Sequence, residues 1–359
     1  MPQPRSPRRQ PRHIPPKGRR AAARPAYAAI DLGTNNCRML VAEPVGNMGD
    51  FRVVDSFSRI VRLGEGIHSR GGLDEGAVER TVAALKICAG KINHRGAVTT
   101  RAVATEACRR ADNCQGFFNQ VEGETGIRLE TISAEEEAGL TLAGCLPLMD
   151  PNAHHTLLFD IGGGSTEVVW VDHAGAAGNT PSQTQLRPKA FLSLPIGVVT
   201  VAERFGDTGV LSDAACAAIF DEVDGALAPF DAAHGISETV NAGGVQMIGT
   251  SGTVTSLGGI YLGLDQYDRT RVDGLEMDFD AIFAVSEKLK GMDLETRTQH
   301  PCIGRGRADL TLPGCAILAA ILKRWPVGRL KAADRGIREG LLTAMITADT
   351  GASRTGAAG

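Results

Sequence analysis

The sequence predicts an α/β protein, and two observations carry that prediction. Short apolar segments of strand length alternate with longer segments whose apolar residues recur at helical spacing, which is typical of strands mixed with helices. A pattern of strand, Asp, glycine turn and strand also occurs twice, about 130 residues apart. The second copy indicates that one structural unit is repeated within the chain.

The first half of the chain begins with an apolar strand at 27–31 that runs into a glycine turn. Val78, Val82 and Leu85 recur at helical spacing and predict a helix over 73–92, with Asp74 near its N-cap position. The other elements expected here are strands at 38–42, 51–63 and 97–104, helices at 117–125 and 134–146, and an extended segment at 127–132.

The second half repeats the opening, with strands at 156–159 and 167–171 around another glycine turn. Residues 175–188 are rich in small and polar residues and predict a flexible hairpin excursion. Helices are expected at 197–205, 213–230, 278–290, 305–324 and 337–348, with a strand at 245–249. We therefore expect two domains, 27–149 and 150–349, between a tail at 1–26 and a flexible C-terminus at 350–359.

Composition excludes several classes of protein. With 43% hydrophobic residues, the chain is not disordered throughout. Its longest nearly uncharged apolar stretch near the C-terminus, 315–322, is far shorter than a spanning helix needs, so no membrane partner is expected. The eight cysteines include no Cys-x-x-Cys pair, which argues against a zinc site or disulfide scaffold and favours a reducing, cytoplasmic compartment.

The net charge of −3 is unevenly distributed. Residues 1–26 hold eight basic residues and no acidic one, so residues 27–359 carry −11. The tail also has few large apolar side chains, which predicts a disordered basic arm. Two interpretations of it stay open, a solvated tail without a partner and an arm that contacts polyanions.

The duplicated turns are the first indication of function. Glycine permits positive φ and close approach, so several backbone N–H groups can converge on one anion. Neither turn contains Gly-Lys-Ser/Thr or follows its strand with Gly-x-Gly-x-x-Gly, which disfavours P-loop and dinucleotide sites. The two turns are thus predicted phosphate-binding loops, each with an Asp that can hold a cation. Their residues are Asp31, Gly33, Thr34 and Asn35 in the first copy and Asp160, Gly162, Gly163, Gly164 and Ser165 in the second.

A third glycine-rich element follows an apolar segment and opens a predicted helix. Gly252 and Thr253 lie in it, within the run Gly249-Thr-Ser-Gly-Thr253. The N-terminus of a helix favours phosphate through its free N–H groups and its dipole. Simple N-capping is the alternative, but beside the duplicated loops we favour the phosphate role.

Paired Asp-Gly hairpins with a downstream Gly-Thr turn resemble the actin-like superfamily. Within it, the chain resembles the exopolyphosphatase/guanosine pentaphosphate phosphohydrolase (Ppx/GppA) family from residue 29 to about 340. The matching segments are Ala29-Ile-Asp-Leu-Gly-Thr-Asn-Asn-Cys-Arg38, Val61-Arg-Leu-Gly-Glu-Gly66, Ala104-Thr-Glu-Ala-Cys-Arg109-Arg-Ala-Asp-Asn113, Ile132-Ser-Ala-Glu-Glu-Glu137-Ala, Phe159-Asp-Ile-Gly-Gly-Gly-Ser-Thr-Glu167, Ser193-Leu-Pro-Ile-Gly197, Gly249-Thr-Ser-Gly-Thr253 and Asp334-Arg-Gly-Ile-Arg-Glu-Gly340.

The resemblance implies two actin-like (ribonuclease H-like) domains with mixed sheets flanked by helices and an active site in the cleft between them. It also implies hydrolysis of a terminal phosphoanhydride of inorganic polyphosphate or guanosine pentaphosphate, usually with Mg²⁺. The family's general base falls on Glu137, its metal- and phosphate-associated acids on Asp160 and Glu167, and a phosphate-contacting Arg on Arg109. The chain departs from the family at Ala134, which replaces Gly, and at Gly139, which replaces an Arg.

Phosphoryl transfer to water assigns each of these residues a task. Glu137 would orient or deprotonate the water, while Asp160 and Glu167, with Asp31 as an alternative, would bind Mg²⁺. Loop amides would hold the phosphate oxygens, and Thr253 would close over them from the second domain. Arg38 and Arg109 would offset the anion's charge, and positive charge is expected to gather around Arg38, Arg62 and Arg109.

Other functions remain open at this stage. The same loops fit an actin-like kinase or ATPase, and Gly139 with the basic arm fits a non-enzymatic sensor of polyphosphate or alarmone. The sequence does not choose between polyphosphate and guanosine pentaphosphate, although the 4% aromatic content favours polyphosphate slightly. Relatives are often dimeric, so a homodimer also stays open.

Overall fold

The computed structural model describes residues 25–46, 49–173, 188–205 and 211–355. The predicted basic tail (1–26) and hairpin excursion (175–188) lie outside these ranges except for their last residues. All eight cysteines carry free thiols. Among the described helices, none combines the length and the apolar composition that crossing a membrane requires.

The first sheet has the strand order β3-β2-β1-β4-β5. The first three strands are antiparallel neighbours, and β4 and β5 add in parallel to β1. These strands are β1 (Ala26–Leu32), β2 (Asn36–Pro44), β3 (Phe51–Ile60), β4 (Ala97–Ala104) and β5 (Leu129–Thr131).

The second sheet repeats this arrangement, with the order β10-β11-β9-β6-β7-β8. Here β6, β7 and β8 are antiparallel neighbours, β9 and β11 add in parallel, and β10 pairs antiparallel with β11. The repeated topology confirms the duplication seen in the sequence. Its strands are β6 (His155–Ile161), β7 (Thr166–Asp172), β8 (Pro188–Leu194), β9 (Val245–Thr250), β10 (Glu276–Asp278) and β11 (Arg329–Ala333).

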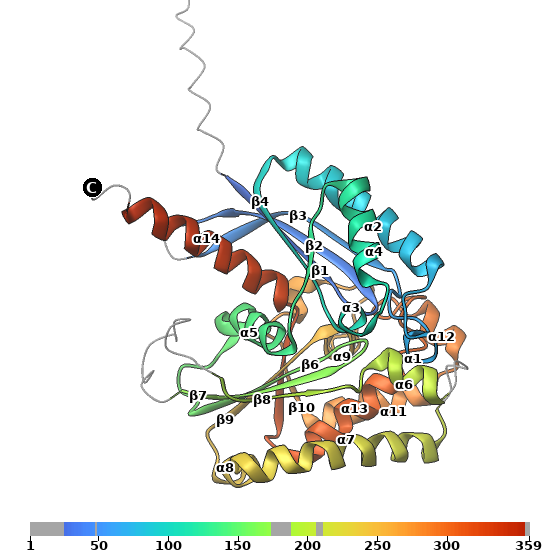
Figure 1. Cartoon of the computed structure of the whole chain (residues 1–359). Coiled ribbons are helices and arrows are strands. Elements are labelled where there is room, and N and C mark those ends of the chain that lie inside the picture. Colours follow the sequence, from blue (N-terminus) through green and yellow to red (C-terminus); the bar gives the residue numbers. More distant parts are fainter. Residues whose placement is uncertain (1–24, 47–48, 174–187, 206–210, 356–359) are drawn as a thin grey trace, which may run out of the picture.

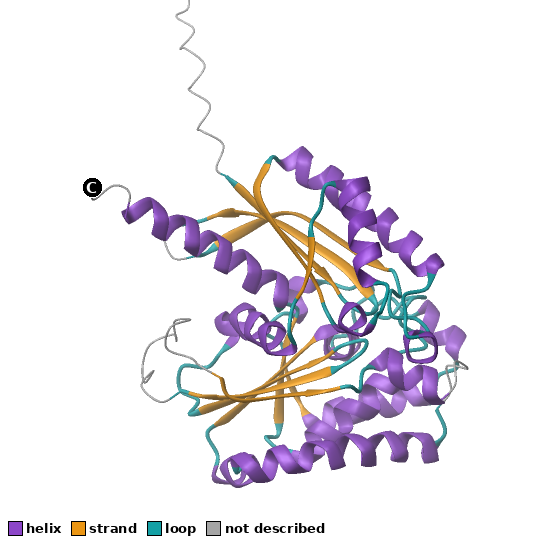
Figure 2. Ribbon diagram, viewed as in Figure 1, coloured by secondary structure: helices purple, strands orange, loops and turns teal. Residues whose placement is uncertain are grey.

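Helices cover both faces of both sheets (Figures 1 and 2). The outer face of the first sheet packs on α2 (Glu75–Arg95) and α4 (Cys114–Thr125). Two helices, α5 (Ala134–Cys145) and α14 (Ile337–Thr355), lie between the sheets. The outer face of the second sheet packs on α6 (Val198–Phe205), α7 (Asp213–His234), α9 (Ser251–Tyr261), α11 (Phe279–Lys290) and α13 (Thr311–Arg324).

Side-chain alternation along the central strands explains these layers. On β1, Ala28 and Ile30 join the apolar cluster under α2 and α4, whereas Tyr27 and Ala29 join the cluster under α14. Successive residues of a strand point to opposite faces, so a strand with helices on both sides is apolar throughout. The division into domains at 149/150 stays a prediction, and the structure adds that α14 packs on the first sheet.

The two central helices approach each other through glycine. A Cβ atom on Gly144 of α5 would lie 2.0 Å from the carbonyl oxygen of Gly336, and one on Gly340 of α14 would lie 2.1 Å from that of Leu140. Only glycine permits so close a backbone contact. The crossing therefore fixes the first turn of α14 against α5.

Several elements differ from the sequence prediction. The predicted helix at 305–324 begins only at Thr311, because turns occupy 301–310 and Gly304 has φ 74°. Strands β8, β10 and β11 were not predicted, and α14 continues into the C-terminus expected to be flexible, as far as Thr355. The remaining short helices are α1 (Ile67–Arg70), α3 (Glu106–Arg110), η1 (Leu146–Leu148), α8 (Ile236–Ala242), α10 (Arg269–Val272) and α12 (Leu294–Gln299).

Candidate functional site

The two glycine turns have the same local structure. Asp31 pairs across its hairpin with Arg38, and Asp160 pairs at the equivalent position with Glu167. Each turn closes through a backbone hydrogen bond of 2.9 Å, from the first glycine N–H to the carbonyl three residues on. The duplicated motif is thus a duplicated hairpin, and each copy lies at the inner end of its sheet.

The two turns meet around one cavity of about 70 Å³. A Cβ on Gly163 would lie 3.0 Å from Thr34 Cβ, and one on Gly164 would lie 2.7 Å from Thr34 Oγ1, so glycine lets the two loops touch. Eleven of the predicted site residues line this cavity: Asp31, Gly33, Thr34, Asn35, Arg38, Glu137, Asp160, Gly162, Gly163, Gly164 and Ser165. The structure therefore brings together loops separated by about 130 residues.

The carboxylates at this cavity hold their protons more tightly than usual. Burial raises the pKa of Asp160 to about 6, and the nearby charge of Asp31 adds to the effect. Burial and the charge of Asp160 raise the pKa of Glu167 to about 7, although the Ser165 and Ser193 hydroxyls hydrogen-bond to it. Burial also raises the pKa of Asp31. A cation or a cluster of donors placed there would relieve this cost.

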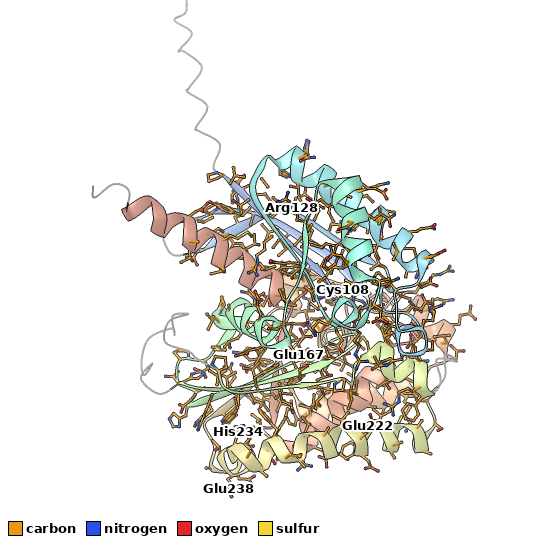
Figure 3. The ribbon with its side chains drawn as sticks, in the orientation of Figure 1. Cys108, Arg128, Glu167, Glu222, His234 and Glu238 are labelled. Carbon is orange, nitrogen blue, oxygen red and sulfur yellow. The ribbon has the colours of Figure 1, made fainter. Side chains whose placement is uncertain are left out.

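Glu137 lies in the first turn of α5 and is buried. Burial, followed by the charge of Glu167, raises its pKa well above the usual range. Arg109 Nη1 donates to Glu137 Oε2 at 2.7 Å and so favours the charged form. Figure 3 marks Glu167 on the second sheet and Cys108, the residue before Arg109, beside the first. Arg109 and Glu167 do not line the 70 Å³ cavity, but each is paired with a residue that does, Arg109 with Glu137 and Glu167 with Asp160.

The third glycine-rich element lies against the second turn. Gly252 and Thr253 line a separate cavity of about 50 Å³, together with Gly162 and Gly163. Ser251, the first residue of α9, has φ 80°, an uncommon conformation for a residue with a side chain, and its hydroxyl hydrogen-bonds to Asp160. Strain of this kind concentrates at functional sites.

A larger cavity of about 300 Å³ continues from the loops between the two sheets. Asp31, Arg38, Asp160 and Ser251 line both cavities, which makes them adjacent. The first residues of α14 also line it, so the positive end of that helix dipole points into the space. Five arginines surround the cavity: Arg38, Arg269, Arg307, Arg335 and Arg338.

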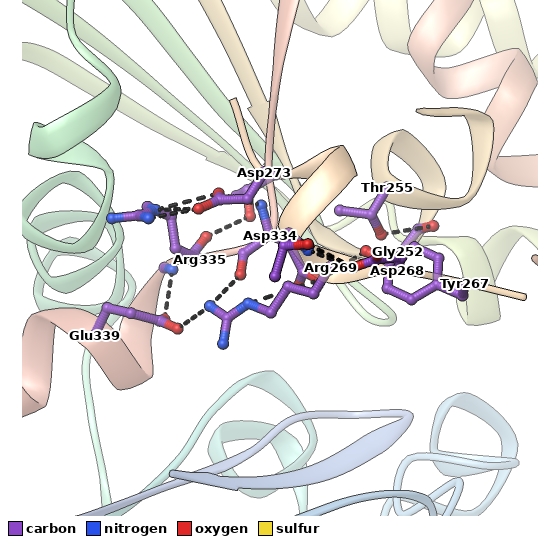
Figure 4. A network of polar contacts seen from close by, with 12 residues as sticks. Gly252, Thr255, Tyr267, Asp268, Arg269, Asp273, Asp334, Arg335 and Glu339 are labelled. Carbon is purple, nitrogen blue, oxygen red and sulfur yellow. Dashed lines mark hydrogen bonds and ion pairs between the residues drawn. The ribbon is translucent and has the colours of Figure 1, made fainter. Parts of the chain in front are cut away.

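These arginines fall into two groups. Arg269 donates to Glu339 at 2.5 Å, and Arg335 pairs with Asp273, as Figure 4 shows. The side chains of Arg38, Arg307 and Arg338 make no hydrogen bond or ion pair with any residue in the described part of the chain. Burial lowers the pKa of Arg307 and of Arg338, and the charge of Arg38 lowers both further. The cavity thus holds three guanidinium groups without a direct ion-pair partner among the described residues, although the charges of Asp31 and Glu339 act on Arg338.

The arginines that supply positive charge to the cavities differ from those that the sequence predicted. Arg38 is where we expected it, but Arg62 pairs with Asp309 at 2.6 Å, outside both cavities, and Arg109 is engaged by Glu106 and Glu137. The prediction of positive charge around Arg62 was wrong because nothing in the sequence shows that Asp309 lies opposite it. Arg335 and Arg338 lie in the Asp334–Gly340 family segment, which could have marked them as site residues. Arg269 and Arg307 lie outside all the family segments, so nothing in the sequence marked them.

The residues at the small cavity fit a hard cation such as Mg²⁺. Asp160 Oδ1 and the side-chain oxygens of Asn35 and Asn36 are buried without a hydrogen-bond partner. Among the described residues, no group of three or more His, Cys, Asp or Glu side chains could hold a metal alone. Mg²⁺ commonly binds one or two carboxylates, several waters and the substrate's phosphates, so the donor set suits it.

Gly139, where the family has an Arg, lies exposed on α5 and lines neither cavity. No atom lies within 4 Å of a Cβ built there. Gly139→Ala should therefore stabilise the protein by about 0.5–1 kcal/mol, because glycine in a helix interior loses more entropy on folding than alanine. Urea unfolding of the variant measures this. A free energy of unfolding unchanged or lowered would show that α5 needs flexibility at this position.

Comparisons with known proteins agree with this arrangement. The sequence model of the Ppx/GppA phosphatase family matches residues 40–348. The chain is 28% identical over 329 residues to a guanosine-5'-triphosphate,3'-diphosphate pyrophosphatase of Photobacterium profundum, covering 90% of this chain and 60% of that protein. It is 27% identical to exopolyphosphatase 2 of Mycobacterium tuberculosis, covering 88% of this chain and 96% of that one.

A solved structure of the Aquifex aeolicus Ppx/GppA family member matches with a TM-score of 0.71 at 25% identity, covering 90% of this chain and 98% of that chain. This likeness confirms the predicted actin-like fold class, with two mixed sheets flanked by helices. The chain spans only about 60% of the length of its pyrophosphatase relative. Because the family's model matches well over half of the sequence, this chain belongs to the Ppx/GppA phosphatase family.

Proposed function

We propose that this protein hydrolyses the terminal phosphoanhydride of inorganic polyphosphate or of guanosine pentaphosphate. The observation that carries the proposal is the junction of two cavities. A small one holds two glycine loops and Glu137, and the larger one holds three arginine side chains without a hydrogen-bond or ion-pair partner among the described residues. A polyanion lying in the larger cavity would place its end at the loops.

Each group at the junction has a role in this reaction. Backbone N–H groups of both loops would donate to the terminal phosphoryl oxygens. Glu137 would orient a water molecule and accept its proton. Arg38, Arg307 and Arg338 would bind the following phosphates, which replaces their mutual repulsion with attraction. Arg109, to which the resemblance assigns a phosphate contact, donates to Glu137 Oε2 at 2.7 Å, and its contact with phosphate stays a prediction.

Asp160 would hold Mg²⁺ together with the Asn35 and Asn36 side-chain oxygens, and Glu167 would sit behind it. When bound, the ion would neutralise part of the phosphate charge. Asp31 remains the alternative ligand, because it lines the same cavity and its pKa is also raised by burial.

The cavity next to Gly252 and Thr253 bears on the kinase or ATPase alternative. Its volume of about 50 Å³ has room for about one or two water molecules, so a nucleoside has more space in the larger cavity than beside these residues. The larger cavity is lined by Phe57 and Tyr267, which offer ring surface to a guanine. The same rings would also accept an adenine, so polyphosphate, guanosine pentaphosphate and ATP all stay candidates, and the turnover assay compares them.

A turnover assay tests the proposal. The purified protein, with Mg²⁺, is given long-chain polyphosphate, guanosine pentaphosphate or ATP with candidate acceptors, and released orthophosphate is measured. We expect orthophosphate from one or both of the first two. Transfer of phosphate from ATP without polyphosphate turnover would support a kinase, and tight binding without phosphate release, measured by calorimetry, would support a sensor.

Stabilisation by Mg²⁺ should depend on pH. Because the native pKa values of Asp160 (about 6) and Glu167 (about 7) lie above their unfolded values, both groups stabilise the fold below about pH 4. That stability is lost as the pH rises through 6 to 7, where the carboxylates become free to bind Mg²⁺. We expect Mg²⁺ to raise the Tm at pH 8 and hardly at pH 5.

The size of the expected rise in Tm follows from mass action. Saturation to 100 times the Kd adds about 2.7 kcal/mol, and each kcal/mol raises the Tm by roughly 1–2 °C in a chain of 359 residues, because the entropy of unfolding grows with length. Asp160→Asn should abolish the increase at pH 8. An equal increase at both pH values, or an increase that survives in Asp160→Asn, would rule out Asp160 as a ligand.

A further inference from the structure

We propose that Glu106 is a positioning residue, which holds Arg109 against Glu137 and so fixes the direction of the general base. The proposal rests on the proposed function, in which Glu137 is that base. Glu106 lies in the family segment that begins at Ala104, but the sequence assigned it no role. Its place is set by α3, the short helix that follows β4.

The contacts of Glu106 are with two arginines. Glu106 Oε2 accepts from Arg109 Nε at 3.1 Å and from Arg109 Nη2 at 2.9 Å. Glu106 Oε1 pairs with Arg110 Nε at 2.7 Å. Both carboxylate oxygens are therefore engaged by cations of the protein, which argues for a bridging role over direct binding of a metal or a substrate group.

The opposite edge of the Arg109 guanidinium contacts Glu137, the proposed base. Arg109 Nη1 donates to the Ile132 carbonyl at 3.1 Å and to Glu137 Oε2 at 2.7 Å. The guanidinium is planar and rigid, so a contact at one edge fixes the direction of the other edge. Side-chain exposures of 18% for Arg109, 15% for Glu106 and 10% for Glu137 mean that little water competes for these contacts.

Backbone packing holds Glu106 itself in place. The N–H of Thr105, the preceding residue, donates to the Leu32 carbonyl at the end of β1. A Cβ on Gly164 would lie 2.9 Å from Glu106 Cγ, so this side chain packs directly under the second phosphate loop. Glu106 also lines the 70 Å³ cavity. One side chain thus touches the loop that receives the phosphate and the arginine that holds the base.

Loss of the Glu106 carboxylate would leave the Arg109 guanidinium able to bind either Glu137 or the substrate's phosphates. Without Glu106, the guanidinium can rotate from Glu137 toward the phosphates, and Glu137 loses its fixed orientation. A displacement of about 1 Å in a catalytic group can cost on the order of 100-fold in rate. Substrate binding should change much less, because the loop amides and the arginines of the larger cavity are untouched.

The test compares Glu106→Gln, Glu106→Asp and the control Glu122→Gln, which removes the exposed Glu122–Arg128 pair. For Glu106→Gln we expect kcat for orthophosphate release to fall about 10- to 100-fold with KM within about twofold of wild type. Glu106→Asp keeps the charge and should recover part of the loss. A parallel rise in KM, or equal losses in Gln and Asp variants with unfolding of both, would overturn the proposal.

A double-mutant cycle separates this proposal from the proposed function. If Glu106 acts through Glu137, Glu106→Gln has little further effect in a Glu137→Gln background, whereas independent effects would multiply. Full activity in Glu137→Gln alone would refute Glu137 as the base and with it the mechanism. An inactive Glu137→Gln beside a fully active Glu106→Gln would refute only the positioning role.

Discussion

Glu137→Gln is expected to lower kcat for orthophosphate release by about 10²–10⁴-fold, the usual contribution of a general base. Glutamine keeps the size of the side chain and still accepts a hydrogen bond from Arg109, but it cannot take a proton from water. Phosphate release is followed at saturating substrate with Mg²⁺. The KM should change little, since Glu137 makes no contact that the ground state needs.

The acidic run in α5 supplies a matched control. Glu135 lies two residues earlier on the same helix, exposed to solvent. Glu135→Gln removes an equal charge from the same helix terminus and should keep wild-type kcat. If Glu137→Gln and Glu135→Gln show the same rate, the base lies elsewhere.

The pH profile gives a second measurement on the same residue. Burial and the charge of Glu167 raise the pKa of Glu137, so the base loses its activity as the pH falls through a value above the ordinary range of a glutamate. The acid limb of the kcat profile should therefore lie above about pH 4.3 in the wild type, and Glu137→Gln should lack it.

Arg307→Ala is expected to raise the KM for polyphosphate about 10- to 100-fold. A hydrogen bond between charged groups contributes about 1.5–3 kcal/mol, and each 1.4 kcal/mol is a factor of ten. The Arg307 side chain has no hydrogen-bond or ion-pair partner in the described ranges, so its loss removes the proposed substrate contact without leaving an ion-paired acid behind. The effect should shrink at high salt, where screening weakens the contact.

Arg305 is the control for this substitution. It lies two residues earlier in the same loop, exposed and outside the larger cavity. Arg305→Ala changes the net charge equally, so a purely long-range effect would appear in both variants. Equal KM values for Arg305→Ala and Arg307→Ala would show that the larger cavity does not bind the chain of phosphates.

Local pattern was enough to predict much of the fold. Asp31 and Asp160 each end an apolar strand beside a glycine turn, and the turn geometry depends on residues adjacent in sequence. The α/β class and the duplicated hairpins could therefore be predicted from the sequence. Strand β11 was not, because it is short and leads straight into the turn before α14, with no run of alternating residues to mark it.

The site was only partly predictable for the same reason. Glu137 came from resemblance to a family, since three consecutive acids at a helix start are ordinary. Arg307 meets Arg38 across almost 270 residues of sequence, and no local signal records such a meeting. Ion pairs also determine which arginines can bind an anion. Arg62 and Arg109 are paired with Asp309 and Glu137, and only the tertiary fold brings these partners together.

The glycine crossing of α5 and α14 has a consequence for how the protein moves. Glu137 lies in the first turn of α5 and Arg338 in the first turn of α14, and Gly144 and Gly340 lock the two helices backbone to backbone. The proposed base and one of the arginines proposed to bind the anion thus lie on two helices in direct backbone contact, which we expect to move together. Tilting of one sheet against the other would then change access to the cavity. The distance between Glu137 and Arg338 would stay the same.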